Sequence, residues 1–149
     1  MRNKYMTMHL QKLSVGSESI DTLTAWQRHV VRKRKARGEL PLHEHVTRMF
    51  PKQAAALLDG GSIYWVIKGQ IQCRNEIAGL EERIGRDGIR RCAILMTPKV
   101  IPVIPTPKRP FQGWRYLKPE DAPADLTAQS GGLELPAELR GKLSDLGAW

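Results

Sequence analysis

The longest alternating pattern in the chain covers residues 60–77, and it constrains the possible fold more than any other feature. One set of alternate positions is mostly apolar and contains Ile63, Trp65, Ile67, Ile71, Cys73 and Ile77. The intervening positions are mostly polar and include Tyr64, Lys68, Gln70, Gln72, Arg74 and Glu76. A period of two residues is typical of a half-buried strand. We therefore predict one long strand, able to bend at Gly69, with an apolar face in the core and an open polar face.

Shorter segments on both sides of this stretch predict further strands and two helices. The expected strands are residues 9–15, 43–50, 90–96, 100–104 and 111–117, and the expected helices are 19–37 and 51–58. Residues 100–104 contain Pro102, so they form an edge strand or an extended loop, because proline has no N–H to donate. Together these elements predict a single α+β domain with a curved mixed sheet or small β-barrel flanked by helices.

The first predicted helix combines an apolar stripe with a basic end. Ser17 or Ser19 can serve as its N-cap. The stripe, which we expect to be buried because of its three- to four-residue spacing, contains Ile20, Leu23, Trp26 and Val30. Five of residues 32–37 are basic. Cations stabilise the C-terminal end of a helix dipole, but this run exceeds that need and favours a surface facing an anion.

Charge divides the chain into two unequal parts. Residues 1–118 contain 22 Lys/Arg and 9 Asp/Glu, whereas residues 119–149 contain 2 and 6. We predict a basic α+β domain over residues 1–126, followed over 127–149 by a linker and a C-terminal amphipathic helix that docks on it. A basic body indicates a polyanionic partner such as RNA. The alternative is an ordinary basic cytosolic protein.

The sequence carries no sign of a membrane segment or of export. No apolar run approaches the ~20 residues that cross a bilayer, and the N-terminus lacks the apolar core of a secretory signal. We therefore expect a cytoplasmic protein with no membrane partner. In that compartment Cys73 and Cys92, which form no CxxC pair, are expected to be reduced core residues.

Two histidines at residues 43–45 raise the question of a metal site. The His-Glu-His spacing puts both imidazoles on one face of a strand. Zinc needs about three or four ligands, so the pair would have to be joined by Cys73, Cys92 or His9. No paired ligand motif occurs elsewhere, and we predict neither a metal nor another cofactor.

Several blocks of sequence together resemble a known family. They are HLQKLSVG at 9–16, TAWQ at 24–27, PKQAAALLDGGSIYWVIKG at 51–69 and TPKRPFQGWRYLKPEDAPADL at 106–126. They resemble domain-of-unknown-function family 1489, an uncharacterised alphaproteobacterial family, over nearly the whole chain. This resemblance implies a bacterial cytosolic protein but no activity, substrate or catalytic residue. At the level of fold alone, the order of strand, short helix with a Gly-Gly exit and long strand is similar to PUA-like, RNA-associated barrels.

These features favour a module that binds structured or single-stranded RNA or another polyanion. Cations hold phosphates, and exposed aromatic rings stack on unpaired bases. The candidate residues lie on the open sheet face, the proline-rich segment, the last strand and the basic helix end: Tyr64, Lys68, Arg74, Lys108, Arg109, Trp114, Arg115, Arg32, Arg34 and Lys35.

Two alternatives remain beside this prediction. In the first, the aromatic residues belong to the core and the cations cover a solvated surface. In the second, the protein is a small enzyme or ligand-binding protein for an anionic metabolite. An enzyme is the less favoured class, because the sequence contains no GxSxG, Walker lysine loop or GxGxxG motif. Catalysis would then depend on a side chain such as Glu76, Asp87 or His45.

Overall fold

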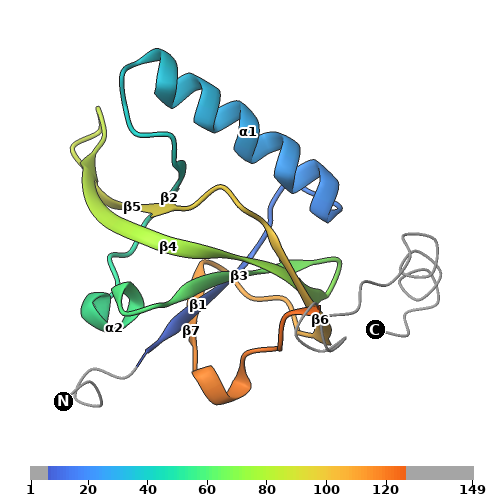
Figure 1. Cartoon of the computed structure of the whole chain (residues 1–149). Helices are drawn as coiled ribbons and strands as arrows, with labels where there is room; N and C mark the ends of the chain where they lie inside the picture. Colours follow the sequence, from blue (N-terminus) through green and yellow to red (C-terminus); the bar gives the residue numbers. More distant parts are fainter. Residues whose placement is uncertain (1–6, 127–149) are drawn as a thin grey trace.

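The computed structural model describes residues 7–126, which form one small α+β domain (Figure 1). Its helices are α1 (Ile20–Ala36), α2 (Ala54–Leu58) and a short 3₁₀ helix, η2 (Pro119–Asp121). Its strands are β1 (His9–Leu13), β2 (His43–Thr47), β3 (Ser62–Ile67), β4 (Gln70–Ile84), β5 (Arg90–Met96), β6 (Ile101–Pro107) and β7 (Trp114–Leu117). The elements follow the predicted order, except that residues 60–77 contribute to two strands, and several ends differ from those predicted. The expected C-terminal helix lies outside the described residues.

The alternating stretch is a hairpin rather than the single strand predicted from its pattern. β3 ends at Ile67, β4 begins at Gln70, and the two pair antiparallel. The turn residues Lys68 and Gly69 both have positive φ angles, of 51° and 78°. Positive φ at both central positions matches the right-handed twist of the strands, as in a type I′ turn. The pattern concealed this turn because Lys is an uncommon residue at positive φ.

A β-bulge changes which face the apolar residues occupy after the turn. Trp65 pairs with Cys73 but Val66 pairs with Ile71, so the register shifts by one residue. The predicted burial of Trp65, Ile67 and Ile71 is confirmed, with exposed fractions of 2%, 1% and 0%. Ile71 nevertheless packs in a second cluster with Val66, on the opposite face from Trp65 and Ile67. One extra residue reverses the side-chain direction in a strand.

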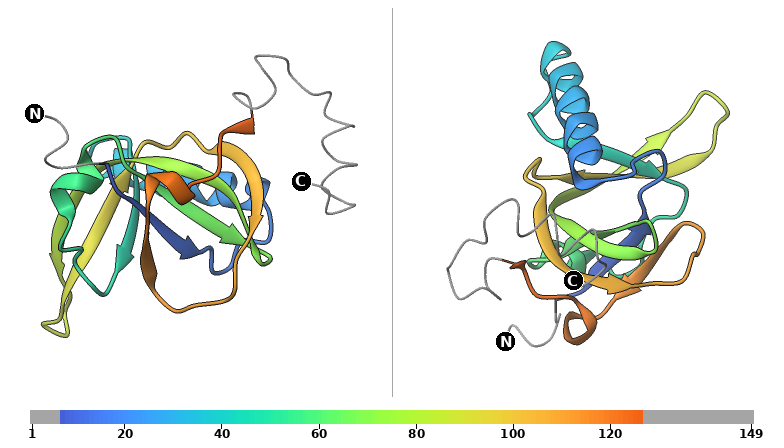
Figure 2. Two further views of the ribbon diagram at one scale, coloured as in Figure 1. Left: turned by 90° about the horizontal axis from the view of Figure 1, so that it is seen from below. Right: turned by 90° about the vertical axis from the view of Figure 1, so that its right-hand side faces the viewer.

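The sheet is mixed, and β4 is its central strand. The hydrogen-bonded order is β2-β5-β4-β3-β1-β7, and β6 pairs with the first half of β4. β1 and β3 are parallel, whereas the other pairs are antiparallel. The sheet is curved, as predicted, and α1 covers one side of it (Figures 1 and 2). Within residues 7–126 β2 and β7 do not pair, so the sheet is not closed into the small barrel that we considered.

Helix α1 packs against the sheet through both apolar and polar side chains. Its buried residues are Leu23, Gln27 and Arg34, whereas Trp26 is 54% exposed. The predicted burial of Trp26 is therefore wrong, because polar residues occupy part of the inner face. The side chain of Gln27 exchanges two hydrogen bonds with Asn75 on β4, of 2.8 and 2.9 Å. Asn75 Oδ1 also accepts a hydrogen bond from Trp65 Nε1 at 2.9 Å.

The start of α1 follows the sequence prediction. Ser19 is the N-cap, and its side chain accepts a hydrogen bond from the Thr22 backbone N–H at 3.1 Å. Thr22 Oγ1 in turn accepts from the Ser19 backbone N–H at 3.1 Å, which completes a capping box. No helix in the described part of the chain is both long and apolar enough to cross a membrane.

Candidate nucleic-acid interface

The outer side of α1 carries three cations in one row, which we call the cationic stripe: Arg28, Arg32 and Lys35. Their spacing of four and three residues places them on one face of the helix. All three side chains are exposed, and none has an ion-pair partner among residues 7–126. Of the candidate residues at the basic helix end, Arg32 and Lys35 are therefore available to a ligand.

Arg34, from the same basic run, is a structural residue. It is 5% exposed and makes an ion pair with Glu44 on β2. It also approaches Glu39 at 3.5 Å, and its Nε donates to the Leu40 carbonyl at 3.1 Å. Arg83 on β4 donates to the same Glu44 carboxylate at 2.9 Å. The expectation that Arg34 faces a ligand is therefore corrected: it joins the C-terminal end of α1 to the sheet.

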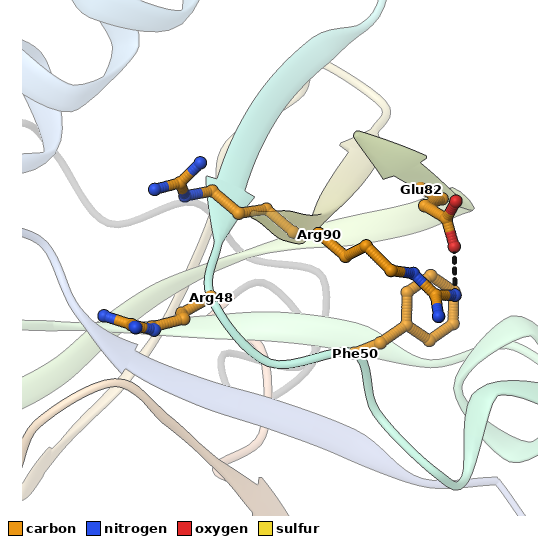
Figure 3. Close-up of a pocket in the computed structure, with 5 residues that line it drawn as sticks. Arg48, Phe50, Glu82 and Arg90 are labelled. Carbon is orange, nitrogen blue, oxygen red and sulfur yellow. Dashed lines mark hydrogen bonds and ion pairs between the residues drawn. The ribbon is translucent and has the colours of Figure 1, made fainter. Parts of the chain in front are cut away.

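The same end of the molecule contains a pocket of about 290 Å³, the arginine pocket, lined by Arg48, Phe50, Glu82, Arg90 and Arg91 (Figure 3). Phe50 is 46% exposed. Figure 3 shows Phe50, Glu82 and Arg90 gathered together, while Arg48 extends away from them. A guanidinium group beside an aromatic ring, with two further arginines in the pocket lining, forms an environment suited to an anion with a planar part.

The arginines of this pocket differ in how they are held. Arg90 pairs with Glu82, and Arg91 pairs with Asp87 at 2.9 Å. Hydrogen bonds from Arg91 and from the Ile89 backbone N–H lower the pKa of Asp87 to about 2. Within the described residues Arg48 has no ion-pair partner. An incoming anion would thus meet one uncompensated arginine and two arginines that already have carboxylate partners.

Two candidate residues of the alternating stretch, Tyr64 and Arg74, do not lie on an open polar face as predicted. Tyr64 is 5% exposed, and burial raises the pKa of its hydroxyl. Its ring packs edge-to-face against His9, with centroids 5.1 Å apart. Arg74 donates two hydrogen bonds of 2.9 Å to Asp125 and one of 2.8 Å to Ser62. Both residues are parts of the scaffold: Tyr64 lies on β3, which is buried on both faces, and Arg74 on β4 is held by Asp125 and Ser62.

Other candidate cations gather at the turn between β3 and β4. The backbone N–H of Lys108 donates to the Gly69 carbonyl at 2.9 Å, which brings Lys108 beside Lys68. Lys68 and Arg109 are exposed, and Lys108 is half-buried. These three residues, which we call the turn group, lie at the opposite end of β4 from the arginine pocket.

The two candidates on β7 already have contacts within the protein. The Trp114 indole donates from Nε1 to the Met49 carbonyl at 3.0 Å and packs against Tyr116, with centroids 4.9 Å apart. The Arg115 guanidinium lies over the Phe111 ring, 5.2 Å from its centroid. Trp114 is half-buried and Arg115 is exposed. Trp114 therefore helps to hold β7 beside the segment that follows β2.

The groups weighed as metal ligands or nucleophiles are dispersed and neutral. Burial lowers the pKa of both His43 and His45 to about 4. Burial raises the pKa of Cys73 to about 12 and of Cys92 to about 11, so both remain thiols at neutral pH. Within residues 7–126 no three His, Cys, Asp or Glu side chains are placed to hold a metal ion.

The sequence prediction missed the arginine pocket entirely. Its residues come from the segment that follows β2, the second half of β4 and the start of β5. The available signals were the Arg-Met-Phe sequence at 48–50 and the two arginines after Gly88. Neither pattern is specific, because their proximity depends on the pairing of β5 with both β2 and β4.

A family model described as "Protein of unknown function (DUF1489)" matches residues 10–149. The chain belongs to this family. The matched region includes the cationic stripe and the arginine pocket, and the DUF1489 description assigns no activity to either. No curated protein and no solved structure matches the chain.

Proposed function

We propose that this protein binds RNA at the end of the molecule where the cationic stripe and the arginine pocket lie. The observation that carries the proposal is the presence of four exposed cations, Arg28, Arg32, Lys35 and Arg48, that have no ion-pair partner among residues 7–126. A cation that has no ion-pair partner within the protein can bind a phosphate and displace the counterions around it. Of the locations in the sequence-based interface, the proposal keeps the basic helix end and adds Arg28 and Arg48 to it.

The contacts of Arg34 support treating stripe and pocket as parts of one surface. Glu44 on β2 binds Arg34 from α1 and Arg83 from β4. Arg83 is the strand partner of Arg91, which lines the pocket. The C-terminal end of α1 and the β4–β5 hairpin accordingly lie on the same side in two views (Figures 1 and 2).

Salt-dependent binding tests the proposal. We expect a labelled RNA to bind the wild type with an affinity that falls steeply as salt increases. In a triple variant, Arg28→Ala/Arg32→Ala/Lys35→Ala, the logarithmic salt slope should decrease by about 2, since each lost phosphate contact removes ~0.7–0.9. Fluorescence anisotropy at four or five salt concentrations measures both quantities, and thermal melting verifies that the variant is folded.

A charge-matched variant at the turn group provides the control. Lys68→Ala/Lys108→Ala/Arg109→Ala removes the same formal charge at the opposite end of β4. We expect a smaller loss of affinity than in the stripe variant. Equal losses in the two variants would mean that net charge alone governs binding, and would contradict the proposed location. Binding by Trp114 and Arg115 stays a prediction that no contact in the structure favours.

A second candidate function rests on the pocket itself. Its volume of about 290 Å³ is close to the lower limit for small-molecule sites, roughly 300 Å³, and its arginines favour an anionic ligand. Thermal melting with inorganic phosphate or with a nucleoside monophosphate separates the two functions. Stabilisation by the small ligand, lost in Arg48→Ala, together with no RNA binding at low salt would favour the small-ligand function.

A further inference from the structure

An aromatic row lies beside the cationic stripe on the outer side of α1. It consists of two aromatic residues, Trp26 and His29, followed by Lys33, and we call the three together the aromatic stripe. Their spacing of three and four residues places them on one face of the helix. Trp26 is 54% exposed, and its indole packs on the His29 ring with centroids 5.5 Å apart and an interplanar angle of 33°. The two rings are neighbours but are tilted relative to each other, and His29 is half-buried, so the exposed indole of Trp26 is the main aromatic surface at this position.

The exposure of Trp26 contrasts with the other tryptophans in the described part of the chain. Trp65 is 2% exposed, and Trp114 is half-buried with its indole N–H bonded to a carbonyl. A large aromatic side chain contributes most when its area is removed from water. A ligand that binds next to the exposed cations could therefore cover the indole and remove its surface from water.

The charges around Trp26 restrict what that ligand can be. Beyond the first turn of α1, which contains Asp21, every charged side chain of the helix is a cation. Lys33 extends the aromatic stripe, and the cationic stripe runs along the other flank of the exposed side. The ligand must then present both negative charge and planar apolar faces, which single-stranded nucleic acid does. In a duplex the bases are stacked on one another, so their planar faces are not available to an indole ring.

We propose that Trp26 and His29 form a base-stacking platform, so that the ligand of this surface is single-stranded RNA rather than duplex. The proposal rests on the proposed function and narrows it to one class of RNA. In it, unpaired bases stack on the indole, while Lys33 and the cationic stripe contact the adjoining phosphates.

Substituting Trp26 tests the platform. We expect Trp26→Ala to weaken binding of single-stranded RNA by about 5- to 100-fold with an unchanged salt slope, because no phosphate contact is lost. Trp26→Phe should keep most of the affinity, since it retains a ring. Leu40→Ala, at an apolar residue that is 68% exposed, is the matched control and should leave binding unchanged. Thermal melting should show that all three variants are folded.

The outcomes separate this inference from the proposed function. If the wild type binds single strands but Trp26→Ala binds them equally well, the platform is wrong and RNA binding by the cations stands. If the wild type prefers a duplex of the same length, the inference is also wrong. If Trp26→Ala converts a wild-type dimer into a monomer in analytical ultracentrifugation, the stripe is a contact between copies of the chain. If the wild type binds neither RNA at low salt, the proposed function fails together with the inference.

Discussion

Both sides of α1 carry polar and charged residues. Those on the inner side bind partners within the protein, whereas those on the outer side are exposed to solvent. On the inner side, Gln27 and Arg34 are nearly fully buried and bonded to Asn75 and Glu44. On the outer side, the cationic stripe is exposed and has no ion-pair partners among the residues that the structure describes. A buried polar group without a partner is strongly destabilising, so the inner set is constrained by the fold. The outer set is not, and it is free to serve a ligand.

The comparison is sharpest within the basic run, residues 32–37. Arg32 and Arg34 are two residues apart, so they lie on opposite sides of the helix. One is exposed and the other is 5% exposed against a carboxylate. Counting charges would treat them alike. Their different surroundings imply that one substitution should affect stability and the other should affect binding.

The largest effect on the inner side is expected at Asn75. Replacing it with leucine, Asn75→Leu, should lower the free energy of unfolding by about 4 kcal/mol, because the Trp65 indole and both polar groups of Gln27 lose buried partners at ~1–3 kcal/mol each. Urea denaturation measures the change. The double variant Gln27→Leu/Asn75→Leu should recover part of it, since it removes both members of the pair. A loss below about 1 kcal/mol in the single variant would contradict the central role of this network.

Acid should weaken the interior through His43. Burial is the main cause that lowers its pKa to about 4 from 6.5, and Arg34 contributes. The folded protein therefore binds fewer protons than the unfolded chain between pH 6.5 and 4, and stability falls as pH decreases through that window. A shift of this size corresponds to about 3 kcal/mol.

The variant His43→Gln isolates this contribution from the other titrating groups. We expect the stability difference between wild type and variant to change by about 3 kcal/mol from pH 7 to pH 4, in favour of the variant at acid pH. Urea denaturation at a series of pH values measures it. A difference that does not depend on pH would show that His43 is not held neutral in the fold.

A direct test of the comparison replaces the two arginines of the run separately. Arg34→Met should destabilise the protein by about 2 kcal/mol, which is less than the ~3–5 kcal/mol for a broken buried ion pair, because Glu44 keeps its bond to Arg83. Arg32→Met should change stability by no more than about 0.5 kcal/mol, as for most exposed residues. For RNA binding the order should be reversed at equal folded concentration. Equal effects of the two variants on stability would show that the inner and outer sides of α1 do not differ in how they contribute to the fold.

The sequence predicted local features well and missed those that depend on distant partners. Alternation identified Trp65, Ile67 and Ile71 as buried, because periodicity reports which side of an element is apolar, but it missed Tyr64 because β3 is buried on both faces. It could not place Trp26, since polar Gln27 takes a core position only where Asn75, 48 residues away, accepts it. The arginine pocket was invisible for the same reason: strand pairing brings its three segments together. The hairpin turn was missed because Lys68-Gly69 lacks the usual Asn or Asp.

The smallest expected effect concerns the N-terminal end of α1. Its N-cap stabilises the helix as a whole and so affects the inner and outer sides alike. Ser19→Ala removes a side-chain acceptor for the Thr22 N–H and should destabilise the protein by about 1 kcal/mol, the usual loss for an N-cap serine. Ser17→Ala is the control, because Ser17 was the other candidate cap and its side chain makes no cap bond in the described structure. Thermal denaturation compares the two. Since the inner face of α1 is also held by the buried Leu23 and by the Asn75 and Glu44 contacts, the cap variant should retain RNA binding. A loss of binding without a loss of stability would show that the first turn itself contacts the ligand.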